Sequence, residues 1–228
     1  MADLQQYWNK SSATIPDDKD PSAYAAEKEQ LFPRQSVVLD LGGGSGADSV
    51  YFASKGHTVK LVDISNVALD RARGIAENKG LATSIETLRA NLNKASIPLQ
   101  SGTCDVVYSR LALHYFGSDT LAKLFTEVYR VLKPGGKAYI TVKSPDDTAE
   151  MGYLKQQATE VEDGVFNESG YIKTRFSVNQ LQVVLSTAGI PADNGNVQRY
   201  TEYLGGRKDK VKSGNSRLVV NEIIITKQ

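Results

Sequence analysis

Short apolar runs alternate with amphipathic stretches along most of the chain. Five runs have the length and composition of buried strands, at 36–41, 57–63, 83–90, 104–109 and 137–143. Three stretches between them have helical spacing, over 47–55, 66–79 and 119–132. Ser65 stands where it can cap the second helix, and Ser118 opens the third. Strands that alternate with helices predict an α/β fold with a parallel sheet covered on both faces.

The last third of the chain breaks this alternation. Residues 144–176 are polar and show no clear periodicity, whereas Ser177 and Gln180 have the spacing of a capping box for the next helix. Two final apolar runs, at 196–204 and 217–227, have no helix between them. We therefore predict that they pair antiparallel as a hairpin at one edge of a Rossmann-like, doubly wound sheet.

The composition is that of a globular protein: 228 residues, 40% hydrophobic and 23% charged, with a formal net charge of +1. This balance gives no general attraction to nucleic acid or to an anionic membrane, and the lysine-rich loop at 205–217 is expected to be a solvated hairpin tip. The chain starts without the layout of a signal peptide, and no apolar run approaches the roughly 20 residues that span a bilayer. One cysteine and two histidines exclude an internal disulfide and leave little material for a metal site. We expect a single cytoplasmic domain over 1–228, a monomer or homodimer, without bound metal, membrane or nucleic acid.

The stretch VVLDLGGGSGADSV, residues 37–50, places four glycines directly after a predicted strand. Gly42, Gly44 and Ala47 fit the dinucleotide fingerprint G-x-G-x-x-A, and Asp63 follows at a spacing that suits a ribose hydroxyl. The fingerprint alone is compatible with NAD and with S-adenosylmethionine, because both carry a ribose. The two differ in charge: NAD has a pyrophosphate, whereas S-adenosylmethionine has a sulfonium and an ammonium against one carboxylate.

Asp40, just ahead of the glycines, discriminates between these two ligands. A carboxylate about 5 Å from a pyrophosphate costs on the order of 1–3 kcal/mol, and beside an ammonium it is favourable by a similar amount. Asp48, in the first turn of the next helix, adds a second negative charge. The pair favours a positively charged nucleoside, unless Asp40 only caps a turn and binds nothing.

Four motifs, in order, resemble those of the class I S-adenosylmethionine-dependent methyltransferases: VLDLGGGSG, VDIS, CDVVYSRLALHYF and VLKPGGKAYIT. The resemblance covers about residues 30–145. It implies a seven-stranded sheet whose last strand inserts antiparallel, and S-adenosylmethionine as cofactor. The segments around 46–65 and 142–190 are also similar, more loosely, to small bacterial enzymes of the tellurite-resistance and thiopurine-methylating group.

The resemblance also implies roles for the matching positions. The loop would meet the methionine part of the cofactor, through Asp40, Gly42, Gly43 and Gly44. Asp63 would accept hydrogen bonds from the ribose hydroxyls, and Ser109 would lie near the methionine. The adenine would be held by Ile64, Asn91 and Leu92. Many relatives have Asp where this chain has Asn91, so a hydrogen bond from the adenine amino group would lack charge assistance.

Methyl transfer from a sulfonium is an in-line displacement that a protein accelerates by alignment and by excluding water. A general base is needed only if the nucleophile must lose a proton. His114, just past the fourth predicted strand, is the nearest candidate for that base. The alternative is that His114 caps the following helix or packs beside the cofactor.

The N-terminal segment holds the single tryptophan. In the resembling family this region folds over the cofactor, which implies a cap over residues 1–30 with Tyr7 and Trp8 on the wall of the substrate pocket. The alternative is that the two rings are an ordinary hydrophobic anchor.

The polar stretch at 144–176 is predicted to be an irregular insertion that serves as a substrate lid, because long loops are commonly functional. Tyr153 and Tyr171 within it, and Tyr115 after the fourth strand, are the other candidate substrate-binding residues.

These observations together favour an S-adenosylmethionine-dependent methyltransferase acting on a small molecule. An NAD-dependent oxidoreductase and a non-catalytic S-adenosylmethionine-binding module are the alternatives. The sequence leaves open whether sulfur, nitrogen, oxygen or a metalloid receives the methyl group.

Overall fold

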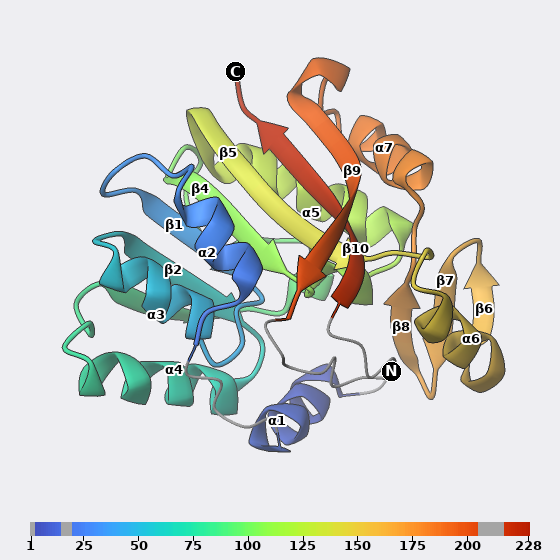
Figure 1. The fold of residues 1–228 in the computed structure, drawn as a ribbon, viewed down its shortest axis with the longest axis horizontal. Coiled ribbons are helices and arrows are strands. Elements are labelled where there is room, and N and C mark those ends of the chain that lie inside the picture. The colour runs from blue at the N-terminus through green and yellow to red at the C-terminus, as the bar shows by residue number, and fades with distance from the viewer. Residues whose placement is uncertain (1–2, 15–19, 205–216) are drawn as a thin grey trace.

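Seven strands form one sheet in the order β3-β2-β1-β4-β5-β10-β9 (Figure 1). The computed structural model describes residues 3–14, 20–204 and 217–228, so most of the lysine-rich loop lies outside the described residues. The strands of this sheet are β1 (Val37–Leu41), β2 (Thr58–Asp63), β3 (Ile85–Arg89), β4 (Cys104–Arg110), β5 (Leu132–Lys143), β9 (Gly195–Tyr203) and β10 (Arg217–Thr226). The first five run parallel, and β10 lies antiparallel between β5 and β9. This confirms the predicted Rossmann-like sheet with an antiparallel last strand.

Helices cover both faces of this sheet (Figure 1). They are α1 (Leu4–Thr14), α2 (Ala23–Glu29), α3 (Ala47–Ser54), α4 (Asn66–Asn78), α5 (Ser118–Val131), α6 (Thr148–Gln157) and α7 (Val178–Thr187). On one face, α2, α3 and α4 bury residues such as Tyr24, Phe52 and Leu69. On the other face, α5 and α7 bury residues such as Phe125 and Leu185. The parallel strands therefore have an apolar layer on each side, as their continuous apolar sequence requires.

The helix starts follow the polar signals in the sequence. The Ser65 hydroxyl accepts a hydrogen bond from the Ala68 N–H at the start of α4. At α7, Ser177 and Gln180 form the reciprocal capping box, each side chain accepting from the other residue's backbone N–H. These caps satisfy backbone donors that have no partner within the helix.

The prediction of an irregular insertion over 144–176 is wrong. This stretch folds into α6 and a three-stranded antiparallel sheet of β6 (Thr159–Glu162), β7 (Val165–Glu168) and β8 (Tyr171–Thr174). The strands have four residues each and β6 is exposed throughout, so no alternation of apolar and polar residues marks them. We call α6 and this second sheet the small-sheet lobe; it lies to one side of the main sheet (Figure 1).

The N-terminal cap expected over residues 1–30 contains two helices, α1 and α2. Whereas α2 packs on the sheet, α1 buries none of its residues and lies near α4 (Figure 1). Among the described residues, no helix combines the length and the apolar character that a membrane span needs.

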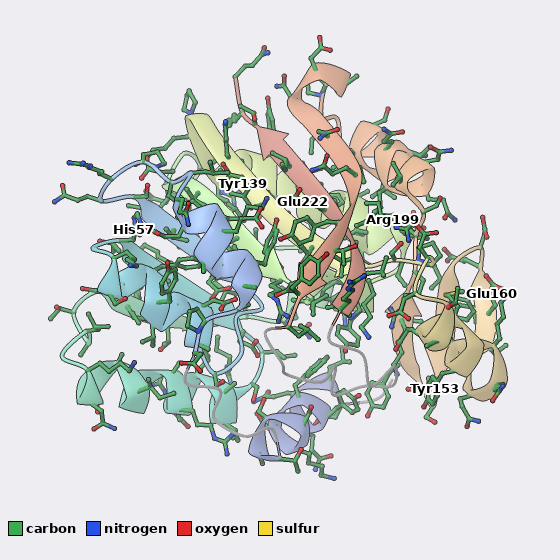
Figure 2. The ribbon with its side chains drawn as sticks, viewed as in Figure 1. His57, Tyr139, Tyr153, Glu160, Arg199 and Glu222 are labelled. Atoms are coloured by element: carbon green, nitrogen blue, oxygen red, sulfur yellow. The ribbon has the colours of Figure 1, made fainter. Side chains whose placement is uncertain are left out.

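His57, the other histidine, lies just before β2, toward the edge of the main sheet away from the small-sheet lobe (Figure 2). Its Nδ1 accepts from the Ser36 N–H at 3.1 Å, and its Nε2 lies 3.3 Å from Glu29 Oε1. His57 therefore ties α2 to the start of the sheet.

Candidate active site

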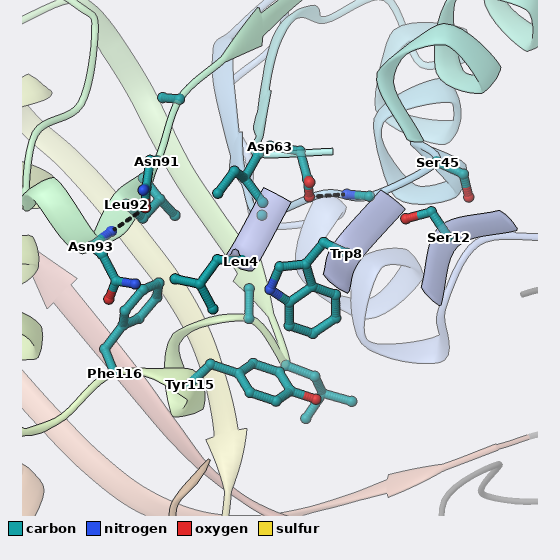
Figure 3. A pocket seen from close by; sticks show the side chains of 16 residues that line it. Leu4, Trp8, Ser12, Ser45, Asp63, Asn91, Leu92, Asn93, Tyr115 and Phe116 are labelled. Atoms are coloured by element: carbon teal, nitrogen blue, oxygen red, sulfur yellow. Dashed lines mark hydrogen bonds between the residues drawn. The ribbon is translucent and has the colours of Figure 1, made fainter. Parts of the chain in front are cut away.

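A cavity of about 180 Å³ lies where the carboxyl ends of β1, β2 and β4 meet α1 (Figure 3). Parallel α/β sheets bind ligands at this edge, where the strand order reverses. The cavity is lined by Leu4, Trp8, Ser12, Gly42, Gly44, Ser45, Asp63, Ile64, Ala90, Asn91, Leu92, Asn93, Leu111, Ala112, Tyr115 and Phe116.

Gly42 and Gly43 of the loop are required by the space around them, and Gly44 by its positive φ of +57°. Gly42 has φ +75°, and a Cβ there would lie 2.4 Å from the Cβ of Ala112. A Cβ on Gly43 would lie 2.4 Å from Oδ2 of Asp40. The loop therefore brings bare backbone to the cavity at Gly42 and Gly44, whereas Gly43 packs over Asp40 and does not line the cavity.

Asp63 presents its carboxylate to the cavity from the end of β2. Its Oδ2 accepts from the Gly44 N–H at 3.0 Å (Figure 3), and its Oδ1 accepts from the Ser65 N–H at 2.8 Å. Burial raises the pKa of Asp63, and these backbone hydrogen bonds oppose the shift. The carboxylate is thus fixed in orientation with lone pairs left to accept from a ligand's hydroxyl groups.

Asp40 lies behind the loop and does not line the cavity. It is 1% exposed and accepts a hydrogen bond from the Ser49 hydroxyl at 2.6 Å. Burial, and then repulsion from Asp48, raise the pKa of Asp40 to about 7. The sequence argument treated Asp40 as a full charge beside the ligand. Here it is a partly ionised group beneath Gly43, because the β1 side chain points into the layer between sheet and α3.

Asp48, the second carboxylate in the sequence argument, is engaged by protein donors. Its Oδ1 accepts from the Ser22 N–H at 2.7 Å, and its Oδ2 accepts from the Tyr108 hydroxyl at 2.7 Å. Asp48 therefore joins α3 to the residues before α2.

The residues predicted to hold the adenine come together, since Ile64, Asn91 and Leu92 all line the cavity. The Asn91 side-chain oxygen accepts from the Asn93 N–H at 3.0 Å, so it caps the short 3-10 helix over 92–94 (Figure 3). This bond fixes the amide and leaves the oxygen one lone pair for a ligand donor. Ser109 does not join them: it is fully buried, and its hydroxyl donates to the Leu41 carbonyl at 2.7 Å, which ties β4 to β1.

His114, the candidate general base, is buried and does not line the cavity. Burial, and then the positive charge of Arg175, hold the pKa of His114 well below its usual value. Its ring packs against Tyr115 at a centroid distance of 4.4 Å. This geometry matches the packing role that the sequence left open as the alternative.

Aromatic rings form the wall of the cavity opposite Asp63. Trp8 and Tyr115 line it and meet edge to face, with ring centroids 4.8 Å apart (Figure 3). Tyr7 contacts Trp8 and stacks on Tyr171 at 4.0 Å, so these two rings extend the wall away from the cavity. Tyr153 is on the lobe at α6, outside the lining, with the Lys173 ammonium 5.8 Å from its ring centroid (Figure 2).

Sequence reasoning missed the other contributions of α1. Leu4, Trp8 and Ser12 have the i, i+4, i+8 spacing of one helix face, and all three line the cavity. The same helix is held near α4 by polar contacts: the Ser65 hydroxyl donates to Asn9 Oδ1 at 2.9 Å, and Arg71 donates to the Ser12 carbonyl. The i, i+4, i+8 spacing was the signal in the sequence that could have identified this helix face, but the polar residues between these positions conceal it.

Residues 39–140 match the family described as a methyltransferase domain. The match covers less than half of the chain, and the sheet order and the glycine loop above agree with it. It supports a methyltransferase domain over these residues. The methyltransferase resemblance read from the motifs is confirmed, and the narrower tellurite-resistance and thiopurine resemblance stays a prediction.

The chain is similar to curated proteins over part of its length. It is 34% identical over 124 residues to a dimethylglycine N-methyltransferase of Parasynechococcus marenigrum, covering 54% of this chain and 43% of that protein. It is 31% identical over 107 residues to the tRNA 5-carboxymethoxyuridine methyltransferase of Escherichia coli, covering 47% and 40%. The matched part thus spans less than half the length of these relatives.

A solved structure of an S-adenosylmethionine-dependent methyltransferase from Methanosarcina mazei has the same fold. The TM-score is 0.69 at 22% identity, over 87% of this chain and 95% of that one. At this identity the similarity supports the fold alone.

Proposed function

We propose that this protein is an S-adenosylmethionine-dependent methyltransferase that transfers a methyl group in line to a small molecule. The observation that carries the proposal is the charge of the cavity wall. Among the described residues that line it, Asp63 is the only charged side chain. A wall with one carboxylate and no cation suits a positively charged nucleoside and opposes a pyrophosphate.

The lining residues fit the cofactor part by part. The Asp63 carboxylate has the geometry to accept from ribose hydroxyls, and Ile64, Asn91 and Leu92 offer an apolar surface with one amide for the adenine. The bare backbone at Gly42 and Gly44 leaves room for the methionine part. When bound, S-adenosylmethionine supplies an electrophilic methyl group on its sulfonium.

The protein's contribution to the reaction is alignment and exclusion of water. The apolar wall of Leu4, Trp8, Tyr115 and Phe116 closes the side opposite Asp63. The described part of the lining has no histidine, lysine or cysteine, and burial raises the pKa of Tyr115 to about 12. The site therefore suits a nucleophile that already has a free lone pair at neutral pH.

A small acceptor is favoured by the position of the site and by the charge of the chain. The cavity lies under α1, and the chain as a whole has a net charge of only +1. The relatives above are named for dimethylglycine and for a modified uridine of tRNA, and both of these named acceptors carry a carboxyl group. The cytoplasmic location and the monomeric or homodimeric state stay predictions.

Isothermal titration with S-adenosylmethionine, S-adenosylhomocysteine and NADH tests the cofactor. We expect micromolar binding of the two adenosyl compounds and no binding of NADH. Binding of NADH without either adenosyl compound would establish the oxidoreductase alternative instead. Transfer of a radiolabelled methyl group to a small-molecule extract, compared with bulk tRNA, then tests the acceptor, and labelling of tRNA alone would overturn the small-molecule part.

A further inference from the structure

Three buried charged residues lie together where the small-sheet lobe meets the end of β5. They are Lys143 at the end of β5, Glu150 in α6 and Arg175 just after β8, and none is more than 5% exposed. The Glu150 carboxylate accepts from Lys143 Nζ at 3.1 Å and from Arg175 Nη2 at 2.6 Å. We call these three residues the buried cationic cluster.

The cluster holds more positive than negative charge. Among the described residues, Glu150 is the only carboxylate within ion-pair distance of Lys143 or Arg175. Asp147 is nearby, but it accepts from the Glu150 N–H as the cap of α6, and the neighbouring Lys173 is paired with Glu168. Two cations thus share one carboxylate out of water, an arrangement that is unfavourable until a further anion joins it.

The cluster also has donor capacity that the protein does not use. Arg175 Nη1 donates to the Thr174 carbonyl at 2.8 Å, but Arg175 Nε is buried without a hydrogen-bond partner among the described residues. The Nδ1 atom of His114 is likewise buried without a hydrogen-bond partner among the described residues. Positive charge from Arg175, Lys143 and Lys173 adds to burial in lowering the pKa of His114, so the imidazole stays neutral beside the cluster. Buried donors without partners are rare in folded proteins and commonly mark a place where a ligand completes them.

The cluster lies directly behind the aromatic wall of the cavity. Tyr115 lines the cavity and packs on His114, and the charges of Arg175 and Glu150 both act on its hydroxyl. The Thr174 hydroxyl, one residue before Arg175, donates to the carbonyl of the cavity residue Phe116 at 2.6 Å. Tyr115 and Phe116 therefore connect the cavity wall to residues of the cluster or beside it.

We propose that Lys143 and Arg175 bind a carboxylate group of the methyl acceptor. The proposal rests on the methyltransferase function above and names the class of acceptor: a small molecule with an anionic end. The Tyr115 side chain rotates to let the anionic end of the acceptor reach the cluster. The nucleophilic atom of the acceptor stays in the cavity. Arg175 offers its free N–H, and Lys143 offers the ammonium hydrogens that Glu150 does not take.

The first test uses the wild-type protein saturated with S-adenosylhomocysteine. Calorimetric titrations with dimethylglycine, malonate and phenylacetate are compared with titrations of their primary amides, which have the same shape without the charge. We expect at least one carboxylate to bind tenfold or more tightly than its amide. If S-adenosylhomocysteine binds but no pair shows this preference, the inference is overturned; if S-adenosylhomocysteine does not bind, the proposed function itself fails.

Variants then separate recognition from a structural role. Arg175→Gln and Lys143→Gln are expected to weaken carboxylate binding at least tenfold while the affinity for S-adenosylhomocysteine is unchanged. The matched control is Glu150→Gln, which keeps both cations and is expected to retain or strengthen carboxylate binding. A purely structural cluster would make all three variants equally unstable in thermal melts, with the carboxylate preference intact in any that fold, and this would contradict the proposal. If Arg175→Gln does not fold, Lys143→Gln decides.

Discussion

The two sides of the cavity differ in both charge and construction. On the cofactor side, Asp63 is the one charged side chain among the described residues that line the cavity, with Asp40 and Asp48 behind the loop. On the acceptor side, aromatic rings face the cavity, with Lys143 and Arg175 buried behind them. The site is therefore polarised: the Asp63 side favours a cation and the side of Lys143 and Arg175 favours an anion, which suits the proposed methyl transfer from a sulfonium to an acidic acceptor.

The two sides also differ in how their residues come together. The cofactor side is made by the consecutive elements β1, α3 and β2, by the backbone of the loop between β1 and α3, and by the residues that directly follow β3. The acceptor side combines α1, the 3-10 helix over 113–115, α6 and β8, which are far apart in the chain. The first is fixed by local geometry, whereas the second depends on the packing of separate segments.

The largest effect is expected from Asp63→Ala, which breaks the cofactor side. The change removes two hydrogen bonds from backbone N–H groups to a carboxylate and the acceptor for the ribose. We expect a loss of about 3 kcal/mol, or roughly 100-fold in the affinity for S-adenosylmethionine by calorimetry. Asp70→Ala, on the exposed face of α4, is the control and should change little. A loss below threefold would show that Asp63 does not hold the cofactor.

Trp8→Ala tests whether the aromatic wall is a cover or part of the core. Because α1 buries no residue, we expect a melting temperature within about 1 °C of wild type but binding weaker by roughly tenfold, from lost apolar contact. The matched control is the exposed Gln6→Ala in the same helix. A drop of several degrees would instead make α1 part of the folded core.

Asp40→Asn tests the charge of the cofactor side through the pH dependence of folding stability. The pKa of Asp40 is raised from 3.8 to about 7, so the folded protein keeps a proton that the unfolded chain loses. Wild-type stability should therefore fall as pH rises from about 4 through 7, and the variant should escape this loss by at least about 1 kcal/mol between pH 5 and 8 in urea titrations. Equal pH profiles for the two proteins would contradict the shift.

The raised pKa of Asp40 also predicts that binding of the cofactor is coupled to release of a proton. A cationic ligand favours the ionised carboxylate, so S-adenosylmethionine binding near pH 7 should release protons from the wild type, and the release should be smaller in Asp40→Asn. Calorimetry in buffers of different ionisation enthalpy measures this release, and equal release in the two proteins would assign it to another group.

The smallest effect on function is expected from Ser177→Ala, outside both sides of the cavity. It removes the capping box of α7, which should cost about 1 kcal/mol and lower the melting temperature by about 2–4 °C. Binding of S-adenosylmethionine should not change, and Ser186→Ala at the exposed end of α7 is the control for the mutation itself. A change in affinity would mean that α7 influences the cavity.

Much of the cofactor side was predictable from the sequence, and little of the acceptor side was. Gly42, Gly44 and Asp63 were found because spacing in one strand–loop–helix unit fixes their positions. Asp40 and Ser109 belong to the same motifs, but they point into the packed layers instead of the cavity. A motif gives the position of the backbone, whereas the direction of a strand's side chain follows from pairing with its neighbours.

Local patterns in the sequence predicted the α/β fold, the order of its elements, the antiparallel hairpin at its end and the glycine loop, because each follows from periodicity or short spacing. Tertiary packing alone placed residues 148–174 in a helix and a second sheet, buried His114, and brought Lys143 and Arg175 together on Glu150 behind Tyr115. The reason is physical: local patterns record which surfaces must be buried, but contacts between distant segments arise only when those surfaces pack together.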